Sequence, residues 1–84
     1  MEKVVLITGA SSGMGKVMAQ LLAEKGFKVY AVARRMEKMQ DLAKAGINVF
    51  SMDVTDESSM ESGVKKVLSN EGRIDVLINN AGIM

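Results

Sequence analysis

The stretch Val4–Gly15, VVLITGASSGMG, decides the fold because it joins a buried strand to the start of a helix. Val4–Thr8 is a short apolar run, which is typical of a strand buried on both faces of a parallel sheet. Glycines follow it at positions 9, 13 and 15. We expect Gly9 to permit the tight turn out of the strand and Gly13 to let the backbone approach a pyrophosphate. Gly15 should let the helix pack closely against the sheet.

This glycine loop (Thr8–Gly15) indicates a phosphate-binding site. The N–H groups at the beginning of a helix have no intrahelical acceptor, and the helix dipole favours negative charge there. Ser11 and Ser12 add hydroxyl donors for phosphate oxygens, and Met14 lies in the same turn. Val17 stands where a Walker loop needs a magnesium-binding hydroxyl, so the loop is not of that type. The alternative is a plain Gly-Ser turn, but the position between strand and helix favours phosphate binding.

The rest of the chain alternates between apolar runs and helical patterns. The apolar runs predict three further strands, at Val29–Ala33, Ile47–Met52 and Asp75–Asn79. The helical patterns predict three helices, over Lys16–Lys25, over Glu37–Lys44 and after a Thr55 cap.

A βαβαβαβ order of this kind requires crossover connections, so the sheet should be parallel with helices on both faces. The sequence therefore predicts an α/β fold, a Rossmann-like three-layer αβα arrangement with strand order 3-2-1-4. We expect residues 1–84 to belong to one domain with no internal boundary. In such a sheet the fourth strand is central, so we also expect an open outer edge here and a chain that is part of a larger domain.

Composition excludes several classes of function. The net charge of the 84 residues is +1, which gives no electrostatic basis for binding nucleic acid or a membrane surface. The first apolar run is too short for a membrane span or a signal peptide. The chain has no cysteine and no histidine, so we expect neither disulfides nor a metal site, and we expect a cytoplasmic protein.

Four motifs in this order resemble those of the short-chain dehydrogenase/reductase family. The loop TGASSGMG is similar to that family's cofactor loop, and Asp53-Val54, after the third strand, to its adenine-contacting pair. Asn79-Asn80-Ala81-Gly82, after the fourth strand, resembles its NNAG motif, and Arg34-Arg35 resembles the basic pair of members that use the phosphorylated cofactor. The resemblance covers the whole chain and implies hydride transfer between a nicotinamide cofactor and a carbonyl or alcohol.

The resemblance also implies roles for the residues at the strand ends. Asp53 would accept from the adenine amino group while Val54 packs on the ring; the alternative is that Asp53 only starts the turn before the third helix. Contact with the ribose side of the cofactor is expected for Asn80, Ala81 and Gly82. Asn79 is expected to order the sheet instead.

Cofactor choice depends on the end of the second strand. An NAD site usually has an acid there for the ribose 2′-hydroxyl, whereas this chain has Arg34 and Arg35. A guanidinium forms a bidentate, charge-assisted pair with a 2′-phosphate, so we expect NADP, with NAD second. The alternative is that both arginines are solvated. Ser12 departs from the pattern of many NADP-preferring members, which carry a basic residue at that position of the loop.

No catalytic residue is predicted. The resembled family uses a serine, a Tyr-x-x-x-Lys pair and a further asparagine beyond the NNAG motif. The only tyrosine is Tyr30, within the second predicted strand, and Arg34 lies four residues on. We therefore expect the parent protein to be the enzyme, a homo-oligomer acting on a small carbonyl or alcohol substrate. The alternatives are a non-catalytic dinucleotide-binding module and a half-fold fragment that self-associates through its open strand edge.

Overall fold

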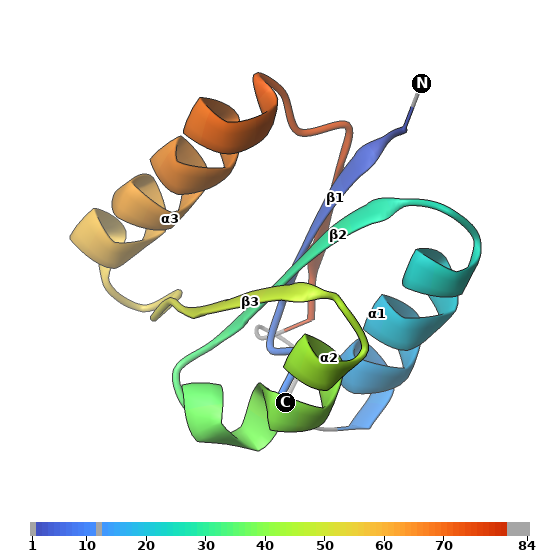
Figure 1. Ribbon diagram of the computed structural model, residues 1–84. Coiled ribbons are helices and arrows are strands. Elements are labelled where there is room, and N and C mark those ends of the chain that lie inside the picture. The colour runs from blue at the N-terminus through green and yellow to red at the C-terminus, as the bar shows by residue number, and fades with distance from the viewer. Residues whose placement is uncertain (1, 12, 81–84) are drawn as a thin grey trace.

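The computed structural model describes residues 2–11 and 13–80 (Figure 1). The strands are β1 (Val4–Thr8), β2 (Lys28–Ala33), β3 (Asn48–Ser51) and β4 (Val76–Asn79). The helices are α1 (Gly13–Glu24), the short 3-10 helix η1 (Met36–Met39), α2 (Gln40–Lys44) and α3 (Glu57–Glu71).

The four strands form one parallel sheet in the order β3-β2-β1-β4, which confirms the predicted order. Leu6 in β1 pairs with Tyr30 in β2 and with Leu77 in β4. The strand order reverses between β1 and β4, since β2 and β3 extend the sheet to one side of β1 and β4 to the other. In open α/β sheets, ligands bind beyond the carboxyl ends of the strands at such a point.

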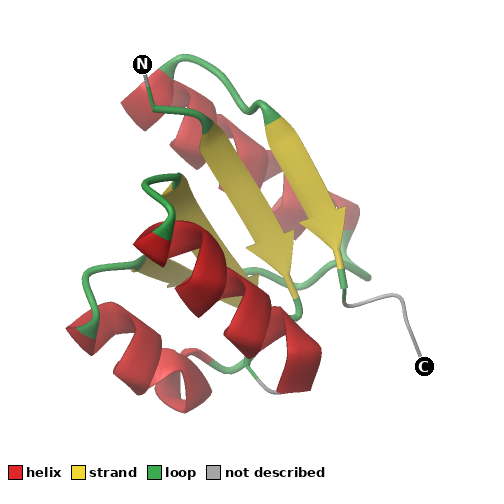
Figure 2. Ribbon diagram, turned by 90° about the vertical axis from the view of Figure 1, so that its right-hand side faces the viewer, coloured by secondary structure: helices red, strands yellow, loops and turns green. Residues whose placement is uncertain are grey.

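Helices cover both faces of this sheet, as Figures 1 and 2 show. Side chains alternate along a strand, so Val5 and Ile7 pack with α1 and α2, whereas Val4 and Leu6 pack with α3. The two clusters share no residue and lie on opposite faces. The predicted three-layer αβα arrangement is therefore confirmed.

Two predicted helix boundaries are wrong. α1 begins at Gly13 rather than at Lys16, because the second half of the glycine loop already forms its first turn. Thr55 does not cap α3; the Asp56 carboxylate accepts from the N–H groups of Ser58 (3.0 Å) and Ser59 (3.4 Å) and caps the helix.

The predicted helix over Glu37–Lys44 is divided into η1 and α2. The division falls at Met39, whose φ of −112° and ψ of 17° are not helical. Its side chain is completely buried in the cluster on the α1 and α2 face. The backbone turns at this residue while the side chain remains anchored in the core.

The outer side of β4 pairs with no strand among the described residues. Val76 and Leu77 retain 38% and 59% of their accessible surface, although strands of this kind are usually buried on both faces. The start of β4 is held to β1 through Asp75, whose Oδ2 accepts from the N–H of Val4 (2.7 Å) and from Nε of Arg73 (2.9 Å). No helix in the described part of the chain is long and apolar enough to span a membrane.

Candidate dinucleotide-binding site

The glycine loop lies at the carboxyl end of β1 and leads into α1, at the edge where the strand order reverses. Gly9 and Gly13 have φ angles of +66° and +56°. Side chains disfavour this left-handed region, so both turns of the loop depend on glycine. Ser11, which lies between these two glycines in the sequence, is half-buried. Ser12, predicted to donate to phosphate, lies outside the described residues.

Neighbouring strands hold the loop from two sides. The Ala10 N–H donates to the Val32 carbonyl in β2 (3.1 Å), and Ala10 itself is completely buried. On the other side, Nδ2 of Asn80, just after β4, donates to the Gly9 carbonyl (3.2 Å). Both bonds hold backbone that would otherwise rearrange when a ligand binds, so the loop is pre-organised.

Gly13 and Gly15 have opposite surroundings. A Cβ atom on Gly15 would lie 2.6 Å from the Gly9 carbonyl oxygen and 2.7 Å from Nδ2 of Asn80, so no side chain fits there. A Cβ on Gly13 would meet nothing within 4 Å. The first turn of α1 therefore faces open space, with N–H groups that lack intrahelical acceptors. A pyrophosphate fits this arrangement in both charge and room.

Arg34 and Arg35 follow β2 at the same edge of the sheet, and both are exposed. Their backbone is fixed: Oγ of Ser51 donates to the Arg34 carbonyl (3.1 Å) and the Lys38 N–H donates to the Arg35 carbonyl (3.2 Å). Within residues 2–11 and 13–80, no carboxylate forms an ion pair with either guanidinium. Both guanidinium groups are thus available to an anion.

Asp53 starts a turn, as the alternative interpretation of this residue required. Its Oδ1 accepts from the N–H (2.9 Å) and the hydroxyl (2.6 Å) of Thr55, and its own N–H donates to Oγ of Ser59. The bonds from Thr55, followed by the positive charge of Arg34, lower the pKa of the Asp53 carboxyl below its ordinary value. Asp53 is therefore an ionised acceptor, and among the described residues both of its carboxylate hydrogen bonds fall on Oδ1. Val54 follows it, half-buried.

The two asparagines after β4 have different partners. Oδ1 of Asn79 accepts from the Thr8 hydroxyl (2.9 Å) and so joins the carboxyl ends of β4 and β1, the ordering role expected of it. Asn80 contacts the glycine loop itself. Ala81 and Gly82, also predicted to contact the cofactor, lie outside the described residues.

Tyr30 points away from this edge. Its hydroxyl donates to the Glu71 carboxylate at the C-terminal end of α3, and burial together with that bond raises its pKa. The N-terminal end of the same helix lies near Asp53, which follows β3. Tyr30 therefore faces the opposite end of the sheet from the loop and serves to hold α3. The part of the chain that the structure describes contains no cluster of acidic side chains that would hold a metal ion.

One contact beside the site was not predicted from the sequence. Nζ of Lys16 lies 3.1 Å from Oδ2 of Asp41, so an ion pair joins α1 to α2. The only sequence signal for it is the position of Lys16, directly after Gly15 of the loop.

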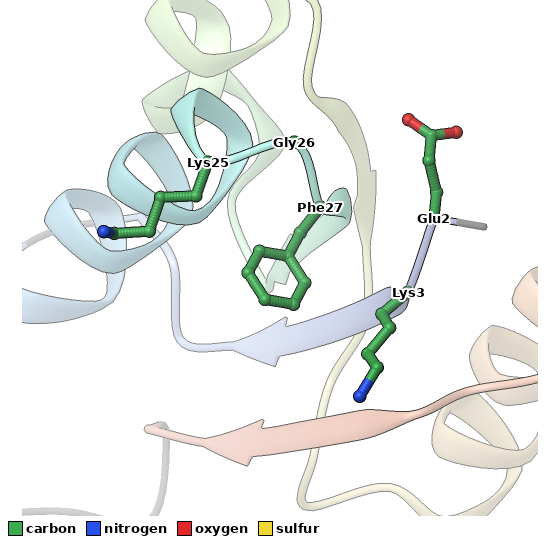
Figure 3. A pocket seen from close by; sticks show the side chains of 5 residues that line it. All are labelled: Glu2, Lys3, Lys25, Gly26 and Phe27. Carbon is green, nitrogen blue, oxygen red and sulfur yellow. The ribbon is translucent and has the colours of Figure 1, made fainter.

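A polar surface hollow lies at the other end of the sheet. Lys3 lies just before β1 and Phe27 just before β2. Figure 3 shows the lining residues, which are Glu2, Lys3, Lys25, Gly26 and Phe27. Because β1 separates this hollow from the glycine loop, it is not part of the dinucleotide site.

Comparison with known proteins agrees with this geometry. The sequence profile described as short chain dehydrogenase matches residues 3–84. The chain belongs to the short-chain dehydrogenase/reductase family. A solved short-chain dehydrogenase from Streptomyces avermitilis is 41% identical, with a TM-score of 0.90 over 95% of this chain and 31% of its own.

The names of two other matched proteins mention a cofactor. The NADPH-dependent 1-acyldihydroxyacetone phosphate reductase of Schizosaccharomyces pombe is 45% identical over 96% of this chain and 28% of its own length. The 3-ketoacyl-(acyl-carrier-protein) reductase of Brucella melitensis, solved with NADH, is 35% identical, with a TM-score of 0.83 over 89% of this chain and 32% of its own. The chain spans about a third of the length of the curated relatives it matches.

Proposed function

We propose that this chain is the N-terminal, dinucleotide-binding part of an NADP(H)-dependent oxidoreductase of the short-chain family. The parent protein transfers hydride between the nicotinamide and a small carbonyl or alcohol substrate. The observation that carries the proposal is the pair Arg34-Arg35, without a carboxylate partner among the described residues, at the sheet edge that bears the glycine loop.

Each part of the cofactor has a complementary group on this edge. The first turn of α1, with Gly13 open in front of it, receives the pyrophosphate. The two guanidinium groups receive the 2′-phosphate, and Oδ2 of Asp53 accepts from the adenine amino group while Val54 packs on the ring. Ser11, Ser12 and Met14 complete the phosphate loop. Asn80 donates to the Gly9 carbonyl, and we propose that Asn80, Ala81 and Gly82 contact the ribose side of the cofactor.

The bound cofactor supplies the hydride or accepts it, and these residues orient it without taking part in the bond changes. Tyr30, the only tyrosine of the sequence, faces the other end of the sheet and is not placed to serve as the general acid. The general acid and the substrate contacts of the parent protein would come from residues outside this chain. We also propose, as in the sequence analysis, a cytoplasmic homo-oligomer.

The test is a calorimetric titration of the wild-type chain and of the double variant Arg34→Ala, Arg35→Ala with NADP⁺ and with NAD⁺. Charge-assisted hydrogen bonds contribute about 1.5–3 kcal/mol each, so the double variant should lose at least about tenfold in NADP⁺ affinity. Its NAD⁺ affinity should be nearly unchanged. The exposed Lys65 on α3 provides a control, because Lys65→Ala removes a positive charge away from the site. Equal losses for the two cofactors would show that the arginines do not bind the 2′-phosphate.

A further inference from the structure

The ion pair between Lys16 and Asp41 lies beside the proposed cofactor site, and the inference drawn from it rests on the proposed function. Of the three ion pairs among the described residues, it alone joins two helices. Lys16 stands in the first turn of α1, directly after Gly15, and Asp41 is the second residue of α2. The pair therefore connects the helix that begins at the glycine loop with the segment that follows the arginines.

Asp41 is held in place by more than one contact. Its Oδ2 lies 3.1 Å from Nζ of Lys16, and its Oδ1 accepts from the N–H of Leu42 (3.1 Å). The bond to Lys16 is the main cause that lowers the pKa of the Asp41 carboxyl. The carboxylate of Asp41 is therefore ionised at neutral pH. The two side chains are 27% and 54% exposed, which places the pair at the surface between the helices.

The short helix η1 connects the arginines to Asp41 along the chain. The Lys38 N–H donates to the Arg35 carbonyl, which ties the arginine turn to η1. Met39 and Leu42 are completely buried and anchor these helices on the sheet. Ala19 of α1 lies in the same apolar cluster as Met39 and Leu42, so apolar packing sets the general distance between α1 and α2. The ion pair supplies a directional contact across that distance.

A 2′-phosphorylated dinucleotide presents two anionic groups from one ribose, the 5′-pyrophosphate and the 2′-phosphate. Two anion sites bind it together only if their spacing matches that of the ligand. We propose that Lys16 and Asp41 are positioning residues that set the spacing between the glycine loop and the Arg34-Arg35 turn. They thereby raise selectivity for the 2′-phosphorylated cofactor over NAD without contacting the cofactor.

The experiment is a titration of the wild-type chain, Lys16→Met and Asp41→Asn with NADP⁺ and with NAD⁺. The two substitutions change the net charge in opposite directions. If the residues acted only through their charge, the loss of Lys16 would weaken NADP⁺ binding and the loss of Asp41 would strengthen it. A positioning role requires both substitutions to change the ratio of NADP⁺ to NAD⁺ affinity in the same direction. Each should lower the ratio of NADP⁺ to NAD⁺ affinity about two- to fivefold, the range of an exposed ion pair, and leave the NAD⁺ affinity unchanged.

Conservative variants and a distant control complete the test. Lys16→Arg and Asp41→Glu preserve the ion pair and should keep the wild-type ratio. Lys65→Met on α3 removes a lysine in the same way and should leave the ratio unchanged. The inference is overturned if the ratio of NADP⁺ to NAD⁺ affinity falls in Lys16→Met but is unchanged or higher in Asp41→Asn. Lys16 would then act on the phosphate directly. If both variants keep the wild-type preference for NADP⁺, the inference is overturned while the proposed function still stands. If the wild type does not prefer NADP⁺, the proposed function is wrong and the inference falls with it.

Discussion

Replacing Gly15 by alanine adds one methyl group where the glycine loop, α1 and Asn80 meet. The new Cβ would lie 2.6 Å from the Gly9 carbonyl oxygen and 2.7 Å from Nδ2 of Asn80, which are the acceptor and the donor of one hydrogen bond. Cβ atoms in proteins essentially never approach other heavy atoms within 3.0 Å. The methyl group must therefore separate Asn80 from the loop or displace α1.

Three contributions determine how much Gly15→Ala lowers the free energy of unfolding. Loss of the Asn80–Gly9 hydrogen bond costs about 0.5–1.5 kcal/mol, and overpacking of a filled site costs about 1–3 kcal/mol. Alanine recovers about 1 kcal/mol, because its helix propensity exceeds that of glycine and Gly15 has no left-handed φ to strain. The net destabilisation is about 2 kcal/mol, which lowers the Tm of a chain of this size by about 8–16 °C.

Gly63→Ala is the matched control, since Gly63 is also a buried glycine within a helix. A Cβ there would press on the Met52 side chain and would lie 3.3 Å from Cε1 of Phe50. The flexible thioether of Met52 can move aside, so the gain in helix propensity offsets the strain and the free energy of unfolding should change by less than about 1 kcal/mol.

The assay is thermal unfolding followed by circular dichroism for the wild type, Gly15→Ala, Asn80→Ala and the double variant. Removing the Asn80 side chain relieves one of the two close contacts, so the double variant should lose less stability than the sum of the two single variants. If Gly15→Ala lowers the Tm no more than Gly63→Ala does, the contact of Gly15 with the loop and Asn80 does not constrain the fold. If the stability losses of the two single variants added up to that of the double variant, Asn80 would take no part in the close contact at Gly15.

Two further predictions concern the loop and the start of β4. Gly13→Val should abolish NADP⁺ binding in a calorimetric titration, because the side chain would enter the open space assigned to the pyrophosphate; unchanged affinity would place the cofactor elsewhere. The Val4 N–H, and to a lesser degree Arg73, lower the pKa of Asp75 below its ordinary value, so the carboxylate stabilises the fold above about pH 4, the unfolded pKa. That stability is lost as pH falls through the lower, folded pKa. The Tm difference between the wild type and Asp75→Asn should thus be present at pH 7 and shrink below about pH 4; a difference independent of pH would contradict this assignment.

The apolar runs predicted the strands, and the alternation of strands with helices predicted their parallel order. Val4–Thr8 was predicted with the bounds that it has, since the glycine loop ends it abruptly. The cap of α3 was assigned to the wrong residue because Thr55 and Asp56 are adjacent and both suit that position. The bonds of Thr55 to Asp53 decide between them, and a propensity for caps does not include that competition.

The sequence predicted that the candidate residues lie at one edge of the sheet, but it did not predict the contacts that they make there. The motifs placed the glycine loop, the arginines and Asn80 at one edge of the sheet, because parallel strands bring their carboxyl ends together. That Asn80 donates to the Gly9 carbonyl, 71 positions away, depends on packing that no local pattern records. The ion pair of Lys16 with Asp41 was missed for the same reason. Charges on different helices carry no information about their distance until the helices are placed on the sheet.

These contacts make the shape of the glycine loop a property of the whole sheet rather than of the loop sequence. Gly9 and Gly13 permit left-handed turns, but glycine permits many other conformations almost equally well. The selection is made by the Val32 carbonyl on one side and by Asn80 on the other. A peptide that contained only β1 and α1 would have every glycine of the motif and neither of these partners. Such a peptide would lose conformational entropy when the loop became ordered on binding. In this protein Val32 in β2 and Asn80 after β4 order the loop before a ligand binds.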